Sequence, residues 1–174
     1  MKINLSGRAR LLGDDINTDY IISSSRKKES LDPNILKQYL LESVDPSFAA
    51  SVIPNDIVVA GKNFGCGSAM EIASTVLLAA GIKAIVARTF ARTFYRNSVN
   101  NGLIPVECDV SSISESDQLE LFLADAQVRI HNNSKPDNAD IIGSPLPAIM
   151  LDILVEGGLV PYFRRHHDFK TSAF

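Results

Sequence analysis

Residues 61–73 of this 174-residue chain read GKNFGCGSAMEIA and join a predicted strand to a predicted helix. The strand is the apolar run IVVA at 57–60, and the helix is the apolar pattern that extends over 68–80. Glycines at such a turn let the backbone come close to a ligand, because they lack Cβ and accept positive φ. The unpaired N–H groups of the following helix can then receive an anion. Ser68 lies where the helix is predicted to begin, so it can serve as a helix cap, as a catalytic group, or as both.

Strands and helices alternate outward from this turn. The central part of the sequence predicts strands at 3–12, 56–60, 83–87 and 103–107, and helices at 68–80 and 90–100. The later part predicts a capped helix at 114–123, strands at 128–130 and 139–142, and a last helix at 145–154 that ends before Gly157 and Gly158. The strand–helix–strand order favours parallel pairing. We therefore expect one α/β domain over residues 1–174, with a mixed, partly parallel sheet flanked by helices.

The segments outside this alternation are polar. Residues 23–32 predict an exposed, mobile loop. Asp32 and Pro33 then form a good helix start, with Asp32 as the cap and Pro33 at the first helical position. The polar end of the chain, residues 165–174, predicts a frayed tail.

The composition is that of an ordinary globular protein. Hydrophobic residues make up 45% and charged residues 21% of the chain, and the formal net charge of -3 argues against nucleic-acid binding. No window reaches the roughly 18 apolar residues that a membrane span needs, and the N-terminus lacks the apolar core of a signal peptide. Two cysteines are too few for a disulfide framework or for a metal cluster. We expect a cytoplasmic protein that binds neither nucleic acid nor membranes and holds no metal.

Two common phosphate-binding motifs do not fit the glycine-rich turn. A P-loop requires Ser or Thr after Gly-Lys, but Asn63 follows Lys62. A dinucleotide-binding fingerprint requires a third glycine at position 70, which is Met70. The sequence therefore predicts only an anion site lined by backbone, with Ser68 at its mouth.

Two other patterns have structural as well as functional explanations. Residues 14–19 carry acidic and amide side chains as a calcium loop does, but Tyr20 stands where an EF-hand needs glycine, so a self-bonded turn is favoured. Arg92 and Arg96 lie one helical turn apart and can clamp a carboxylate or phosphate, or form a solvated helix face.

Four stretches together resemble the small subunits of the isopropylmalate dehydratase family, which correspond to the swivelling domain of the aconitase superfamily. They are residues 13–19, 59–68, 87–97 and 157–162, and they occur in the family's order over nearly the whole chain. The resemblance implies a swivelling β/β/α domain that supplies part of an active site. A separate large subunit would hold a [4Fe–4S] cluster and complete the site, while this chain binds no cofactor itself.

The resemblance also implies a reaction and the residues that take part in it. The family dehydrates and rehydrates a malate-type hydroxy acid, as in leucine biosynthesis, and so moves a hydroxyl between neighbouring carbons. Ser68 matches the family's catalytic base, and Asp19 matches an acidic active-site position. The segment 23–31 matches the loop that contacts the side group of the substrate. The predicted substrate-binding residues are Asp19, Arg26, Lys27, Lys28, Gly67 and Ala69.

The central turn departs from the family pattern at one informative place. Family members usually read GSSREH or GSSREQ, whereas residues 67–72 read GSAMEI. Met70 thus stands where the family has an arginine that binds a substrate carboxylate, and a thioether cannot replace a bidentate guanidinium. Three explanations stay open: a different substrate, a replacement cation from Arg26, Lys27 or Lys28, or a subunit that is a non-catalytic partner. A homoaconitase-type or dimethylmalate-type dehydratase is the alternative among enzymes.

Overall fold

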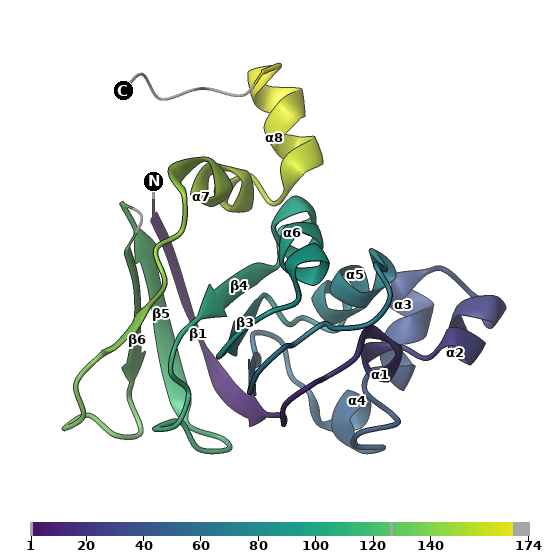
Figure 1. Ribbon diagram of the computed structural model, residues 1–174, viewed down its shortest axis with the longest axis horizontal. Coiled ribbons are helices and arrows are strands. Elements are labelled where there is room, and N and C mark those ends of the chain that lie inside the picture. Colours follow the sequence, from purple (N-terminus) through teal and green to yellow (C-terminus); the bar gives the residue numbers. More distant parts are fainter. Residues whose placement is uncertain (1, 126, 169–174) are drawn as a thin grey trace.

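A mixed seven-stranded sheet with the strand order β4-β3-β2-β1-β5-β6-β7 runs through the molecule. The computed structural model describes residues 2–125 and 127–168 (Figure 1). The strands are β1 (Lys2–Leu11), β2 (Ile57–Ala60), β3 (Ala84–Ala87), β4 (Ile104–Glu107), β5 (Gln118–Ala124), β6 (Gln127–Asn132) and β7 (Ile141–Gly143). The helices are α1 (Thr18–Ile21), α2 (Ser24–Glu29), α3 (Pro33–Leu36), η1 (Lys37–Tyr39), α4 (Phe48–Ser51), α5 (Ile72–Ala79), α6 (Arg92–Asn101), α7 (Ala148–Val155) and α8 (Leu159–His166).

The long strand β1 joins a parallel and an antiparallel half of the sheet. Its residues from Lys2 to Arg8 pair antiparallel with β5, and those from Ala9 to Leu11 pair parallel with β2. The strands β2, β3 and β4 continue the parallel half, with α5 and α6 as the crossover connections. The predicted mixed, partly parallel sheet with flanking helices is therefore confirmed.

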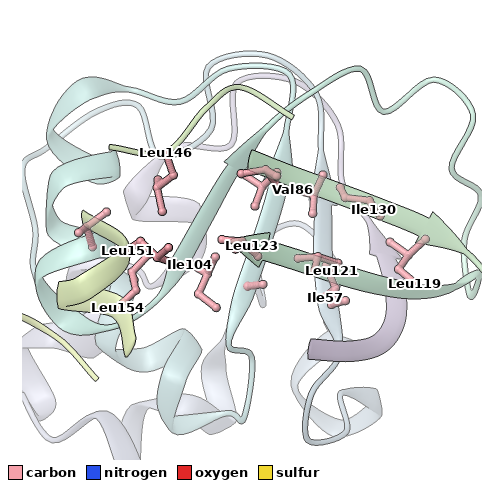
Figure 2. Packing of buried hydrophobic residues seen from close by; sticks show 14 of the residues in the cluster. Ile57, Val86, Ile104, Leu119, Leu121, Leu123, Ile130, Leu146, Leu151 and Leu154 are labelled. Carbon is pink, nitrogen blue, oxygen red and sulfur yellow. The ribbon is translucent and has the colours of Figure 1, made fainter. Parts of the chain in front are cut away.

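The parallel half is buried on both faces, which explains its uninterrupted apolar sequences. Ile57 of β2 and Val86 of β3 point toward the antiparallel half, while their chain neighbours Val58 and Ile85 face the helices. The sheet thus has one hydrophobic core on each face. Figure 2 shows the core between the two halves of the sheet. In it, residues of β2, β3 and β4 pack against the leucines of α7 and against Leu119, Leu121, Leu123 and Ile130 of β5 and β6. The chain thus forms two β layers and one helical layer.

The predicted helix at 114–123 is wrong, because residues 114–117 contain a turn and β5 occupies the rest of the segment. Leu119, Leu121 and Leu123 alternate with more exposed residues and enter the core from one face of the strand. A period of two residues is that of a strand, and the helical prediction gave too much weight to Ser114 as a cap.

The ends of the predicted helices also differ from the structure. The segment predicted as a loop at 23–32 contains the short helix α2, whose cap Ser23 accepts a hydrogen bond from the Arg26 backbone. Asp32 caps α3 as predicted, since its Oδ1 accepts from Asn34 N at 2.9 Å. Beyond Gly157 and Gly158 the chain forms α8, which contains Arg165, the first residue of the predicted tail. The rest of that tail from residue 169 lies outside the described residues.

Candidate active site

The glycine-rich turn lies at the carboxyl end of β2, between two other segments that fix its path. On one side, Gly65 N donates to Ile16 O at 2.8 Å, and Thr18 N donates to Cys66 O at 2.8 Å. On the other side, Phe64 N donates to Thr89 O at 3.0 Å. The turn thus forms an isolated β-bridge on each side, although it has no regular secondary structure of its own.

Gly67 needs to be glycine for two reasons. Its φ is 94°, in the left-handed region that side chains disfavour. A Cβ built at this position would also overlap the side chain of Asn17, which caps α1 by accepting from Asp19 N. The turn and the start of α1 are therefore packed against each other without room for a methyl group.

Replacing Gly67 with alanine is expected to lower the free energy of unfolding by about 1–3 kcal/mol, because the new side chain is strained at this φ and displaces Asn17. Denaturant unfolding of the full chain measures the effect. Gly13→Ala is the matched control, since a Cβ there meets nothing within 4 Å. Equal stability of the two variants would show that the turn tolerates a side chain.

Ser68 is exposed, and it does not cap the following helix. Helix α5 begins at Ile72 with Glu71 in the cap position, so the prediction that Ser68 starts the helix is wrong. The three residues after Ser68 are not helical, because Thr18 Oγ1 donates to Ser68 O at 3.0 Å and holds the Ser68 backbone against α1. Within the described part of the chain, the Ser68 hydroxyl makes no hydrogen bond, so it is available to a ligand.

The backbone around Ser68 offers donors to an anion. The N–H groups of Ser68, Ala69 and Met70 donate to no acceptor among residues 2–125 and 127–168. Unpaired amides that precede a helix stabilise negative charge, both as hydrogen-bond donors and through the helix dipole. Gly67 and Ala69 are exposed on either side of Ser68 and are thus accessible to a bound molecule.

An ion pair between Asp19 and Lys27 lies next to this turn. Lys27 Nζ is 3.0 Å from Asp19 Oδ1 and also contacts Met70 Sδ. Ser24 Oγ donates to the same Asp19 oxygen at 2.6 Å. The pKa of the Asp19 carboxyl is lowered below its usual range by the hydrogen bond from Ser24 and then by the one from Lys27, so the carboxylate is ionised at neutral pH.

Lys27 is the predicted loop cation that the structure brings to the turn. Its side chain is only 13% exposed, because α1, α2 and Met70 surround it. Arg26 instead forms two hydrogen bonds with Glu42, at 3.0 and 3.2 Å, and stacks over the ring of Tyr39. Lys28 is exposed on the outer side of α2 and has no ion pair with the described residues. Arg26 and Lys28 are therefore not part of the arrangement around Ser68.

Thr18 and Ser24 hold Ser68 and Asp19 in place, and the sequence did not single them out. The Thr18 hydroxyl fixes Ser68, and the Ser24 hydroxyl fixes Asp19. Their small polar side chains resemble those of many surface residues, and only the tertiary contacts distinguish them. Thr18 did lie in the stretch 13–19 that carries the family resemblance, which was the one available signal.

Neither cysteine is an activated thiol. Burial raises the pKa of Cys66, with Asp15 adding to the effect. Burial raises the pKa of Cys108 to about 12, and Asp109 contributes. In the part of the chain that the structure describes, no group of three His, Cys, Asp or Glu side chains is placed to hold a metal ion.

The raised pKa of Cys108 predicts slow alkylation in the folded chain. A pKa of about 12 in place of 9.0 lowers the thiolate fraction at pH 8 roughly a thousandfold, and the thiolate is the reactive form. Mass spectrometry after iodoacetamide treatment should show Cys108 unmodified until denaturant is added. Equal rates in the folded and unfolded chain would contradict the assigned burial.

Comparisons with known proteins place the chain among a group of enzyme subunits. Residues 24–111 match the aconitase C-terminal domain family. The chain is 41% identical to the 3-isopropylmalate dehydratase small subunit 2 of Archaeoglobus fulgidus, over 97% of this chain and 99% of that relative. It is 37% identical to the methanogen homoaconitase small subunit of Methanocaldococcus jannaschii, over 92% of each chain.

A solved structure has the same fold. The crystal structure of the 3-isopropylmalate dehydratase of Methanocaldococcus jannaschii superposes with a TM-score of 0.87 at 36% identity, covering 95% of this chain and 96% of that one. No helix within residues 2–125 and 127–168 has the length and apolar character to cross a membrane.

Proposed function

This chain belongs to the family of 3-isopropylmalate dehydratase small subunits, and from that membership and the geometry of its turn we propose that it contributes the catalytic base of a heteromeric hydro-lyase. The substrate is a malate-type hydroxy acid, which is isomerised by dehydration and rehydration. The observation that carries the proposal is the exposed Ser68 hydroxyl beside three backbone amides, none of which bonds to a residue that the structure describes.

Ser68 acts as the base that removes the proton next to a carboxylate. A serine hydroxyl is a very weak base, so its alkoxide has to be stabilised for this step. The amides of Ser68, Ala69 and Met70 and the positive end of α5 favour that charge. Thr18, which holds the Ser68 carbonyl, positions the residue without taking part in the chemistry.

The large subunit completes the active site. The family resemblance implies a [4Fe–4S] cluster, and we place it in the large subunit, since Cys66 and Cys108 are too few to ligate one in this chain. The cluster would supply the Lewis acid that accepts the leaving hydroxide. The surface that carries Ser68 and Lys27 then faces the large subunit and closes the site from one side, in an enzyme that we expect in the cytoplasm.

Lys27 provides the cation that Met70 lacks. Its ammonium group lies against the Met70 sulfur, at the position where the family pattern leads us to expect an arginine. Asp19 holds the ammonium in place and balances its charge until a substrate carboxylate arrives. A lysine offers a point charge in place of a planar fork, so it binds a carboxylate with a looser geometry.

The substrate is 3-isopropylmalate or a close relative, and the second candidate is a malate-type acid with a carboxylate on its side group. The names of the relatives include isopropylmalate, citramalate and homoaconitase enzymes. Anaerobic reconstitution with a large subunit, followed by turnover assays on malate-type acids with an apolar or an acidic side group, distinguishes the two. Full activity of the large subunit alone would overturn the catalytic role and leave a non-catalytic partner.

A further inference from the structure

A cleft distinct from the Ser68 turn lies where α6 begins. Its volume is about 320 Å³, at the lower end of the range of small-molecule sites. It is bounded by α6, by the end of β4 and by α7, which lie beside one another in Figure 1. The lining residues are Phe90, Arg92, Tyr95, Arg96, Glu107 and Met150.

The two arginines of the cleft have charges that no described residue balances. Arg92 and Arg96 are exposed, and neither forms a hydrogen bond or an ion pair with any residue in 2–125 or 127–168. They lie one helical turn apart, where like charges repel each other. The exposed arginines Arg88 and Arg165, by contrast, pair with Asp109 and Glu156. Two guanidinium groups without a partner among the described residues, on one side of a cleft, can pair with a carboxylate.

The cleft also contains a carboxylate oxygen that bonds to no described residue, and it has an apolar floor. Glu107 Oε1 accepts from Phe90 N at 3.2 Å, whereas its Oε2 has no partner in the described structure. The floor is formed by the ring of Phe90, which is 9% exposed, and by the half-buried side chains of Tyr95 and Met150. Burial raises the pKa of Tyr95, and Glu107 adds to this, so the phenol stays a neutral hydrogen-bond donor.

We propose that this cleft binds a small aliphatic amino acid. Arg92 and Arg96 take the carboxylate, the unpaired oxygen of Glu107 takes the ammonium group, and the aliphatic chain lies on Phe90 and Met150. An aliphatic hydroxy acid has a donor at the same place but lacks the charge, so it binds more weakly at Glu107. The proposal is independent of the function of Ser68.

Isothermal titration of the full chain with four probes tests the assignment. L-leucine should bind, and 2-hydroxy-4-methylpentanoate should bind several-fold more weakly. Removal of the donor in 4-methylpentanoate is expected to weaken binding about tenfold, and removal of the carboxylate in leucinamide should abolish it. Leucinamide binding as tightly as leucine, or the absence of heat with every probe, would overturn the proposal.

Variants tie the binding to the named residues. Arg92→Ala and Arg96→Ala should each weaken leucine binding at least tenfold, and the matched control Arg88→Ala should leave it unchanged. Glu107→Gln should weaken the binding of leucine but not that of 4-methylpentanoate. A merely structural role of Glu107 does not explain such a difference between the two probes. Ser68→Ala should bind leucine normally. If the arginine variants affect only the assembly with a large subunit, the cleft is a protein interface and the proposal is wrong.

Discussion

Exchange of Ser68 for alanine is expected to lower the kcat of the reconstituted complex about a thousandfold, in the range typical for loss of a positioned acid or base. The hydroxyl is the only group removed, and it makes no hydrogen bond to the described part of the chain, so the turn should keep its structure. The effect should therefore appear in kcat, with assembly of the complex unchanged. Steady-state rates under anaerobic conditions, with size-exclusion chromatography of the complex, provide the measurement.

Ser112→Ala is the control for this experiment, because Ser112 is likewise exposed and lies in the connection between β4 and β5. It should leave kcat unchanged. An assembled Ser68→Ala complex with normal turnover would show that another group removes the proton. The unpaired amides around position 68 would then be a substrate-binding site without a base.

The sequence was sufficient for the position of the turn but not for its conformation. Strand β2 and the glycines at 65 and 67 are visible as a local pattern, because an apolar run and positive φ have direct signatures in residue type. The delayed start of α5 is not visible, because it depends on Thr18, which lies 50 residues away in the chain and holds the Ser68 carbonyl. The local preference of serine for the cap position was outweighed by a tertiary hydrogen bond to its carbonyl.

The assignment of the loop cations shows the same limit. Arg26, Lys27 and Lys28 are consecutive and chemically alike, so residue type cannot rank them. The short helix α2 determines which cation lies beside the turn. It directs Arg26 toward Glu42 and Tyr39. It directs Lys27 toward Asp19 and Met70. The helix carries no apolar stripe that would reveal it, and it is stabilised by these contacts instead.

Replacing Lys27 with alanine is expected to raise the KM for a malate-type substrate about 10- to 100-fold. This corresponds to the loss of a charge-assisted hydrogen bond of about 1.5–3 kcal/mol to a substrate carboxylate. Lys28→Ala is the matched control and should leave KM unchanged, because Lys28 has no ion pair with the described residues. Initial rates of the reconstituted complex over a range of substrate concentrations measure both effects.

The contact between Lys27 and Met70 allows a second variant to separate charge from structure. If the ammonium group replaces a guanidinium at position 70, Met70→Arg should restore most of the lost affinity in the Lys27→Ala background. In the wild-type background, Met70→Arg places two cations beside Asp19 and should raise the affinity for the substrate little further. A Lys27→Ala defect that Met70→Arg does not relieve, in a complex that still assembles, would mean that Lys27 only positions Asp19. The substrate carboxylate would then be bound by the large subunit. The methionine at position 70 would in that case mean that the two subunits contact different groups of the substrate than in relatives with an arginine there.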